Sequence, residues 1–389
     1  MSGLAALPVG GAGARLGEPL AALPPPGDAV PLEAVHARAY RFPTGGPESD
    51  GTLEWASTTM VLVEVRAGGR RGVGYTCGSA AAATVVSEAL APVVLGQDAM
   101  AIPHLWQSMV RSTRNLGRSG IASMAVAALD NALWDLKARI LEVPLVTLLG
   151  AVRDAVPVYG SGGFTNLDTR ALVAQLTGWT EAGISRVKMK VGREREADAG
   201  RVHAVRAAIG DQVELFVDAN GAYARKEALA MAAEFAAAGV TWFEEPVPSA
   251  DVEGLRRVRE RAPGGMEIAA GEYGWRLEDL HRLAATGAVD VLQADLTRCE
   301  GLSVFLQAGA LAAACSLPLS SHTAPALHLH AACALPALRH LEYFHDHVRL
   351  EERFFDGTRA PRGGCLHPDL GRPGHGLEFK EPDARRYAL

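Results

Sequence analysis

The residues with the clearest chemical meaning are ionisable groups that recur at the ends of short apolar runs. Lys188 and Lys190 lie two residues apart in one run, so both side chains point to the same side of a strand. The later runs end in or near an acid or a histidine, namely Asp218, Glu244, Glu272, Asp295, His322 and Glu342. Burying such groups singly is costly, which indicates that they form one functional cluster.

Three of these acids form a set of oxygen ligands. Asp218, Glu244 and Glu272 end three successive runs, and no cysteine or histidine adjoins any of them in the sequence. Mg²⁺ binds a few carboxylates and fills its other positions with water and substrate oxygens, whereas zinc favours cysteine and histidine. We therefore predict a Mg²⁺ site. Glu245 follows Glu244 directly, and in a regular strand its side chain would point the other way.

Two candidate bases accompany this metal site. Lys190 has Lys188 beside it, and a neighbouring cation lowers the pKa of an ammonium group, which helps a lysine to accept a proton. Asp295 from the neighbouring run can orient His322, because a ring N–H donated to a carboxylate fixes the tautomer. A metal between two bases indicates abstraction of a proton next to a substrate carboxylate.

The elements that must position these groups form a repeat. Eight apolar runs begin near residues 156, 186, 214, 242, 266, 291, 317 and 340, with Ala-rich helical segments between them. Their spacing of about 25 residues fits one strand, one helix and two loops, and eight such units predict a closed α/β barrel. An open doubly wound sheet would need a Gly-rich turn after its first strand, and Gly160–Gly163 lacks the full fingerprint. The strand ends of a barrel form its active-site mouth.

The segment before the repeat predicts a separate α+β domain over residues 31–150. It has β-rich runs at 34–42, 58–65 and 71–76, a Gly-, Pro- and acid-rich loop at 43–55, and helical patterns at about 80–95, 101–115 and 120–140. Residues 350–389 have little periodicity and are expected to complete this domain, which assigns 151–349 to the barrel. Residues 1–30 are interpreted as a loose leader rather than a signal peptide.

The composition limits the function classes. The chain of 389 residues is 48% hydrophobic and 21% charged, which excludes disorder of the whole chain. With 38 basic and 44 acidic residues the net charge is −6, which argues against a nucleic-acid partner. No apolar run reaches the ~20 residues of a membrane span. The five cysteines form no CxxC pair, which is typical of a reduced, cytoplasmic protein.

In combination, these motifs resemble the enolase superfamily, and within it the mandelate racemase subgroup. The resemblance spans roughly residues 31–380, and order, spacing and strand position agree together. Its pieces are VKMKVG (187–192), FVDANGAY (216–223), FEEPV (243–247), AAGE (269–272), QADLTRCEG (293–301), SSHTAP (320–325) and HLEYF (340–344). Asp295 stands where the muconate cycloisomerase subgroup has a second lysine, and a histidine base differs from the true enolases.

The resemblance implies a modified TIM (β/α) barrel with an N-terminal α+β capping domain. As Mg²⁺ ligands it implies Asp218, Glu244 and Glu272. As catalytic groups it implies Lys190 and His322 on opposite faces of the substrate, Asp295 as the partner of His322, and Lys188, which tunes the base and touches the substrate carboxylate. As substrate-binding groups it implies Asn220 and Glu342. It further implies a small-molecule carboxylate substrate and a homo-oligomer, either a dimer or an octamer.

The function that follows is Mg²⁺-dependent dehydration of an acid sugar to a 2-keto-3-deoxy acid, a carbon–oxygen lyase reaction. The alternative is a racemase or epimerase of a 2-hydroxy acid or sugar acid, because the same two bases serve both reactions. A catalytically silent binding protein is a third hypothesis, although loss of activity usually leaves gaps among such costly charges. A nucleotidyltransferase would rest on the Gly-rich stretch 10–17 alone, which lacks a strand before it.

Two further segments bear on the substrate. The resemblance implies that capping-domain loops choose the substrate, here the stretches at 36–40 and 43–55. Asp50, Glu54 and Trp55 could reach a polyol, or they could equally be solvated loop residues. His345-Asp346-His347 follows the eighth run and is an incomplete set for a second metal. We interpret it as a hydrogen-bonded loop near the mouth, with His345 or His347 as a candidate substrate contact.

Overall fold

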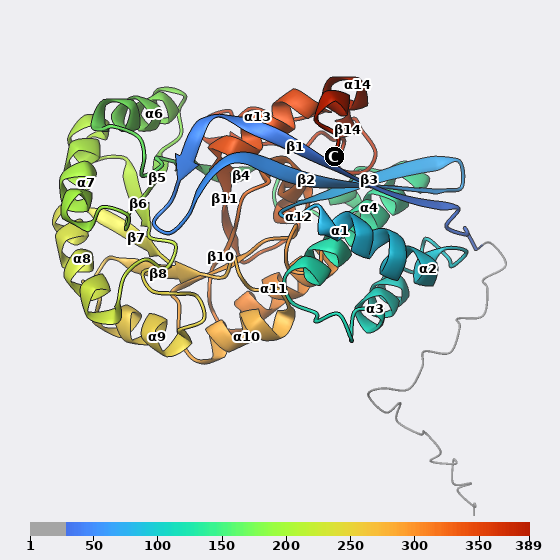
Figure 1. Cartoon of the computed structure of the whole chain (residues 1–389), viewed down its shortest axis with the longest axis horizontal. Helices are drawn as coiled ribbons and strands as arrows, with labels where there is room; N and C mark the ends of the chain where they lie inside the picture. Colours follow the sequence, from blue (N-terminus) through green and yellow to red (C-terminus); the bar gives the residue numbers. More distant parts are fainter. Residues whose placement is uncertain (1–28) are drawn as a thin grey trace, which may run out of the picture.

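Eight parallel strands close into a barrel in the computed structural model, which describes residues 29–389 (Figure 1). Neighbours follow chain order, and a parallel pairing between the first and last strand closes the ring. The strands are β4 (Val156–Gly162), β5 (Arg186–Lys190), β6 (Glu214–Asp218), β7 (Val240–Glu244), β8 (Glu267–Ala270), β9 (Val291–Ala294), β10 (Leu319–Ser321) and β11 (Leu338–Phe344). Each predicted apolar run contains one of them, so the predicted barrel is confirmed. The Gly-rich stretch 10–17 lies outside the described residues.

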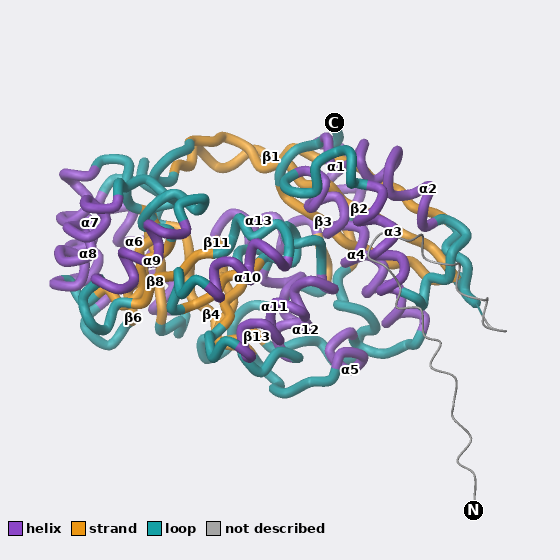
Figure 2. The backbone as a smooth tube through the Cα atoms, turned by 90° about the horizontal axis from the view of Figure 1, so that it is seen from below, coloured by secondary structure: helices purple, strands orange, loops and turns teal. Residues whose placement is uncertain are grey.

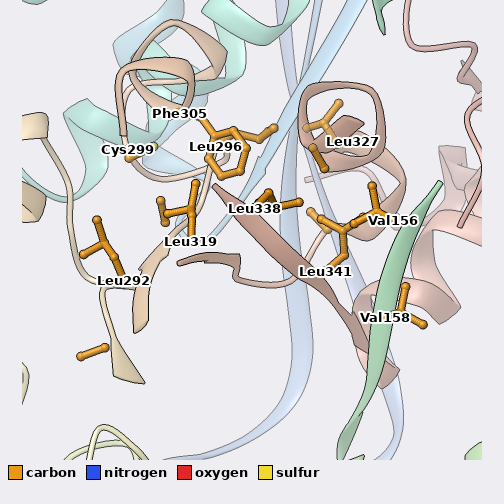
Figure 3. Close-up of a cluster of buried hydrophobic side chains, with 14 of the residues drawn as sticks. Val156, Val158, Leu292, Leu296, Cys299, Phe305, Leu319, Leu327, Leu338 and Leu341 are labelled. Atoms are coloured by element: carbon orange, nitrogen blue, oxygen red, sulfur yellow. The ribbon is translucent and has the colours of Figure 1, made fainter. Parts of the chain in front are cut away.

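A helix follows each strand of the barrel and covers its outer face. These helices are α6 (Thr169–Glu181), α7 (Arg195–Ile209), α8 (Arg225–Ala237), α9 (Val252–Arg261), α10 (Leu277–Ala285), α11 (Leu302–Ala314), α12 (Pro325–Cys333) and α13 (His345–Phe354). Because strand side chains alternate, Val187 and Met189 of β5 pack outward into the main core, while Lys188 and Lys190 face the interior. Figure 3 shows part of that outer core, between β4, β9 to β11 and the helices beside them.

Large rings fill the half of the barrel that lies beneath the strand ends. A buried cluster consists of Tyr159, Phe216, Trp242, Ala269 and Val291. The ring of Trp242 stacks on that of Phe216, with centroids 5.1 Å apart. The interior is therefore a packed floor rather than a pore. The imidazole of His340 is packed among these rings, with its centroid 4.8 Å from that of Tyr159, and the ion pairs of Lys188 and Lys190 lie above this layer, at the strand ends.

The N-terminal domain is an antiparallel sheet covered by helices. Its strands β1 (Ala34–Ser49), β2 (Glu54–Ala67) and β3 (Arg70–Cys77) lie side by side in this order. Its helical segments are α1 (Ala81–Val85), a π-helical turn (Val86–Leu90), α2 (Ala91–Val94), α3 (Ile102–Ser112), α4 (Ile121–Ile140) and α5 (Leu145–Leu149). Gly72 lets α4 approach β3 closely, because a Cβ there would lie 2.3 Å from the carbonyl oxygen of Ala132.

The C-terminal segment returns to this sheet. After α13 come β12 (Phe355–Asp356), β13 (Cys365–Leu366), β14 (Glu378–Phe379), α14 (Glu381–Ala384) and a 3₁₀ turn (Arg385–Tyr387). The backbone N–H of Leu389 donates to the carbonyl of Ala39 on β1 at 3.0 Å. Strand β13 instead pairs antiparallel with the first two residues of β4, Val156 and Pro157. Within residues 29–389, no helix is both long and apolar enough to cross a bilayer.

The expected loop at 43–55 is wrong in its extent, because both strands continue through most of it. β1 runs to Ser49 and β2 starts at Glu54, with a shift of register between Pro43 and Glu48. Glycine and proline in this stretch mark a bulge rather than a loop. The result is a hairpin arm, which we define as residues 43–58. It reaches from the capping domain across the barrel, as both views show (Figures 1 and 2).

Candidate active site

Strand register brings the predicted metal ligands together at the C-terminal ends of the barrel. Lys190 on β5 lies opposite Asp218 on β6, and Asp218 lies opposite Glu244 on β7. Glu272 follows β8 by two residues. One carboxylate oxygen from each of Asp218, Glu244 and Glu272 lies within 4.8 Å of the others, and all three residues are buried. We call these three residues the acid triad.

The acid triad fits a divalent cation with oxygen ligands. Burial, and next the charge of Asp218, raise the pKa of Glu244, because like charges oppose ionisation. Oε2 of Glu272 lies 3.3 Å from Nε2 of His322 but accepts no hydrogen bond of acceptable geometry. Unpaired buried carboxylate oxygens are expensive, and a cation would neutralise them. The donor set contains only oxygens, which suits Mg²⁺.

The expectation that Glu245 continues the side-chain alternation of a regular strand is wrong, because β7 ends at Glu244. The φ of 38° at Glu245 leaves the strand conformation, so side-chain alternation stops at Glu244. The side chain is fully buried, and both of its carboxylate oxygens lack a hydrogen-bond partner among the described residues. Burial and the charge of Glu272 raise its pKa well above the ordinary value. Sequence periodicity cannot find such a turn.

The two lysines contact different parts of this cluster. Nζ of Lys188 lies 2.7 Å from Glu244 and 2.8 Å from Glu342, and its side chain is 0% exposed. The predicted contact of Lys188 with the substrate carboxylate stays a prediction. Nζ of Lys190 lies 2.5 Å from Oδ2 of Asp218. Burial lowers the pKa of Lys190, but the charges of Asp218, Glu272 and Glu244 together outweigh it. The net pKa is therefore raised, opposite to our expectation from Lys188 alone.

His322 and Asp295 form the predicted pair. Nδ1 of His322 lies 2.8 Å from Oδ2 of Asp295, and the other oxygen of Asp295 accepts the N–H of Thr297 at 2.7 Å. Burial lowers the pKa of His322, but Glu272 and the hydrogen bond to Asp295 raise it, and the net pKa lies above the ordinary value. After His322 the backbone is left-handed at two successive non-glycine residues, Thr323 and Ala324, with φ of 48° and 41°. Such strain is typical of functional sites.

One cavity of about 270 Å³ opens onto this cluster, and Glu272 is the member of the acid triad that lines it. Lys190 and His322 both line it. Because Lys190 ends β5 and His322 directly follows β10, they approach from nearly opposite sides of the ring of strands. Asn220 and Glu342 also line it, and their role in substrate binding stays a prediction. Glu342 is held in place by the hydroxyl of Ser161 at 2.6 Å and by the N–H of Thr323 at 2.7 Å.

The hairpin arm and its surroundings form the roof of this cavity. Asp50, Trp55 and His347 line it, as proposed from the sequence, whereas Glu54 is exposed and pairs with Arg193 at 3.2 Å. His345 does not line the cavity. Sequence reasoning missed five further lining residues, namely Ser57, Thr58, Thr59, Cys77 and Tyr273. The first four belong to the capping domain, and only its position over the barrel brings them to the site. Tyr273 directly follows Glu272, and this neighbour was the signal that could have found it.

The arm is fixed to the barrel by backbone contacts. The N–H of Thr165, after β4, donates to the carbonyl of Ser49 at 2.8 Å. Gly51 at the tip lies so close to the barrel that a Cβ there would be 2.4 Å from the carbonyl oxygen of Ala219 and 2.6 Å from that of Val191. Oδ1 of Asp50 shapes the turn by accepting the N–H of Leu53 at 2.7 Å.

Comparison with known families agrees with this fold and site. Residues 171–384 match the model of the enolase C-terminal domain-like family. Residues 49–150 match the mandelate racemase / muconate lactonizing enzyme N-terminal domain. The chain therefore belongs to the enolase superfamily, in the mandelate racemase / muconate lactonizing enzyme group, and it is an enzyme of that group.

Two similar proteins each align with most of the chain. The 3,6-anhydro-alpha-L-galactonate cycloisomerase of Streptomyces coelicolor is 35% identical over 89% of this chain and 96% of its own length. A mandelate racemase/muconate lactonizing enzyme-like protein from Rubrobacter xylanophilus is 54% identical, with a TM-score of 0.90 over 92% of this chain and 100% of that chain.

A third similar protein was solved with a metal. The L-talarate/galactarate dehydratase of Salmonella typhimurium, liganded with Mg and L-lyxarohydroxamate, is 30% identical, with a TM-score of 0.85 over 93% of both chains. Dehydratases and cycloisomerases of acid sugars therefore both occur among the proteins that this chain resembles.

Proposed function

We propose that this enzyme dehydrates an acid sugar to a 2-keto-3-deoxy acid with Mg²⁺ bound at the acid triad. The observation that carries the proposal is the presence of two proton-transfer groups, Lys190 and His322, on opposite sides of one cavity beside three buried carboxylates. When bound, Mg²⁺ supplies positive charge beside the substrate carboxylate, where negative charge develops once C2 loses its proton.

Lys190 is the group that takes the C2 proton in this proposal. Its ammonium form is stabilised mainly by Asp218, at 2.5 Å. A divalent cation bound to Asp218 would offset the negative charge that raises the pKa of Lys190. The pKa of Lys190 would then fall, which favours the neutral amine that a base requires. Lys188, which lies between Glu244 and Glu342, holds the ligand carboxylates in position and adds a second cation that disfavours the charged form of Lys190.

His322 is the group that protonates the leaving oxygen. Its raised pKa keeps the ring charged to higher pH than an ordinary imidazole, and Asp295 stabilises that charge at 2.8 Å. In this step the C3–O bond breaks, the oxygen takes the proton of His322, and water leaves. The enol that remains becomes the 2-keto-3-deoxy acid by taking a proton at C3.

Epimerisation is the second candidate, and the same opposed pair favours it. If no leaving group lies near His322, this residue can return a proton to the other face of C2, which inverts that centre. A C3 oxygen that belongs to a ring would leave without release of water, and the product would then be an isomer of the substrate.

A screen of mono- and diacid sugars and 2-hydroxy acids with Mg²⁺ in D₂O separates these outcomes by proton NMR and mass. Dehydration predicts loss of the C2–H signal, a new deuterated methylene and a mass lower by one water. Exchange at C2 without a dehydrated product means epimerisation. A ring-opened product with the same atomic composition as the substrate means isomerisation. Absence of exchange with every acid would contradict the proposed chemistry.

A further inference from the structure

The cavity has two chemically different ends. At the end next to the acid triad it is lined by charged groups of both signs. At the other end, which we call the cap end, it is lined by the hairpin arm and the start of α13, chiefly by Trp55, Ser57, Thr58, Thr59, Asp346 and His347. With the substrate carboxylate at the acid triad, as in the proposed function, the cap end receives the part of the substrate that is farthest from it.

The cations that line the cavity, among residues 29–389, all belong to the triad end. Lys190 is bound to Asp218. Arg298 lies 3.3 Å from Oε1 of Glu272, and its guanidinium carbon lies 5.4 Å from the centre of the Tyr273 ring. His322 lies between Asp295 and Glu272 at 2.8 Å and 3.3 Å. Among the described residues, no cation lines the cap end.

The histidine at the cap end is a neutral donor. Nδ1 of His347 accepts the backbone N–H of Ala324 at 3.2 Å, so the proton of the neutral ring lies on Nε2. Burial lowers the pKa of His347 to about 4, although Asp346 opposes this shift. A neutral ring N–H in a cavity wall is suited to a hydroxyl or ether oxygen of a ligand.

The acid at the cap end, Asp346, has a cation beside it, but that cation lies outside the cavity. Asp346 lines the cavity and accepts a hydrogen bond from the hydroxyl of Thr58. Arg349 pairs with it at 2.5 Å and donates to the carbonyl of Pro43 at 3.1 Å, but Arg349 does not line the cavity. Asp346 therefore shields the cavity from the charge of Arg349. Glu48, which is buried nearby, adds a further acid beside Asp346.

We propose that the site takes a sugar monoacid whose far end is neutral, a polyol or cyclic ether, and discriminates against sugar diacids. This rests on the proposed function and adds the substrate class. A second carboxylate at the cap end would lose water, meet no cation and face Asp346, which is unfavourable on all three counts. Hydroxyl groups find acceptors in Asp346 and the threonines, and a donor in His347. The similar proteins named above include enzymes for both classes, so their names alone do not decide it.

The test compares acids that differ only at C6. With Mg²⁺, kcat/KM is measured for D-galactonate against galactarate and for D-gluconate against D-glucarate, and binding of each is measured by calorimetry. We expect the preferred monoacid to exceed its diacid by at least ~10-fold in kcat/KM and in affinity, the size of one repulsive contact at an intermediate dielectric. Equal values or a preferred diacid overturn the inference, even if C2–H exchange supports the proposed function. If no acid exchanges, the proposed function fails, and the order of the affinities still decides the inference.

A substitution tests the cause of the discrimination. Asp346→Asn removes the shielding charge and leaves Arg349 free to approach a ligand, so the diacid-to-monoacid ratio of affinities should rise by ~10-fold or more. Asp369→Asn is the matched control, since Asp369 is also three residues before an arginine, Arg372 at 3.7 Å, but does not line this cavity. An unchanged ratio in folded Asp346→Asn contradicts the role of this charge. If that variant does not fold, the comparison of acids on the unmodified enzyme still decides the proposal.

Discussion

Arg118→Ala should destabilise the enzyme by leaving a buried carboxylate without its partner. Glu300 lies in the loop before α11 with its side chain 0% exposed, and Arg118 of the capping domain binds both of its oxygens, one of them at 2.7 Å. The indole N–H of Trp106 donates to the carbonyl of Glu300 at 3.0 Å. This contact therefore joins the capping domain to the loop that carries Asp295.

The expected loss follows from the burial of the two partners. Breaking a buried ion pair by removing one partner costs about 3–5 kcal/mol. Arg118 is 26% exposed and keeps some contact with water, so we expect a loss near the lower limit, about 3 kcal/mol. Glu300 has a φ of 61°, which favours glycine. Arg118→Ala combined with Glu300→Gly removes the orphan charge and the strain, and should recover about 2 kcal/mol.

The assay is urea unfolding of each variant, monitored by tryptophan fluorescence, with the free energy of unfolding extrapolated to water. Arg256→Ala is the control, because its pair with Glu253 on α9 is exposed, at 36% and 44%, and should contribute less than about 1 kcal/mol. Two results would refute the reasoning. One is a loss in Arg118→Ala no larger than in the control, and the other is a double variant less stable than Arg118→Ala alone.

Three further predictions follow from other parts of the structure. Gly51→Ala should lift the hairpin arm from the barrel and raise KM, whereas Gly45→Ala, with nothing within 4 Å of its added Cβ, should leave KM unchanged. Asp218→Asn should weaken Mg²⁺ binding in calorimetry at least ~10-fold, and unchanged binding would place the metal elsewhere. Burial raises the pKa of Glu351 from 4.5 to about 7, so the folded state retains a proton that the unfolded state has lost. The contribution of this proton to the free energy of unfolding is complete below pH 4.5 and is lost as pH rises through 7, by up to about 3 kcal/mol. Glu351→Gln should reduce the difference in the free energy of unfolding between pH 5 and pH 8.

The barrel was predictable because its strands leave a simple signature. Strands of a parallel sheet are buried on both faces, so they appear as short apolar runs, and a charge at the end of such a run requires an explanation. Asp218 and Glu244 end β6 and β7, and the register of neighbouring strands places them together without any knowledge of loops. The Asp295–His322 pair follows in the same way, since β9 and β10 are neighbours.

The roof of the site was not predictable, because it depends on contacts between distant segments. Residues 43–55 contain glycines and prolines, which predict a loop, yet packing against the barrel holds most of them in strand conformation. The pairing of Thr58 with Asp346 joins residues 288 positions apart. Glu245 and Lys190 were misjudged for another reason. A left-handed residue ends the side-chain alternation at Glu245, and carboxylates from neighbouring strands raise the pKa of Lys190.

The central claim is that Lys190 and His322 act on opposite sides of one substrate, and exchange of the C2 proton in D₂O tests it most directly. With the acid found in the screen, Lys190→Ala should lose exchange by at least ~100-fold, while His322→Asn should keep exchange but form little product. Lys226→Ala and His281→Asn, both exposed positions, are the controls and should match the unmodified enzyme. Exchange at the unmodified rate in Lys190→Ala, with full product formation in His322→Asn, would contradict the account.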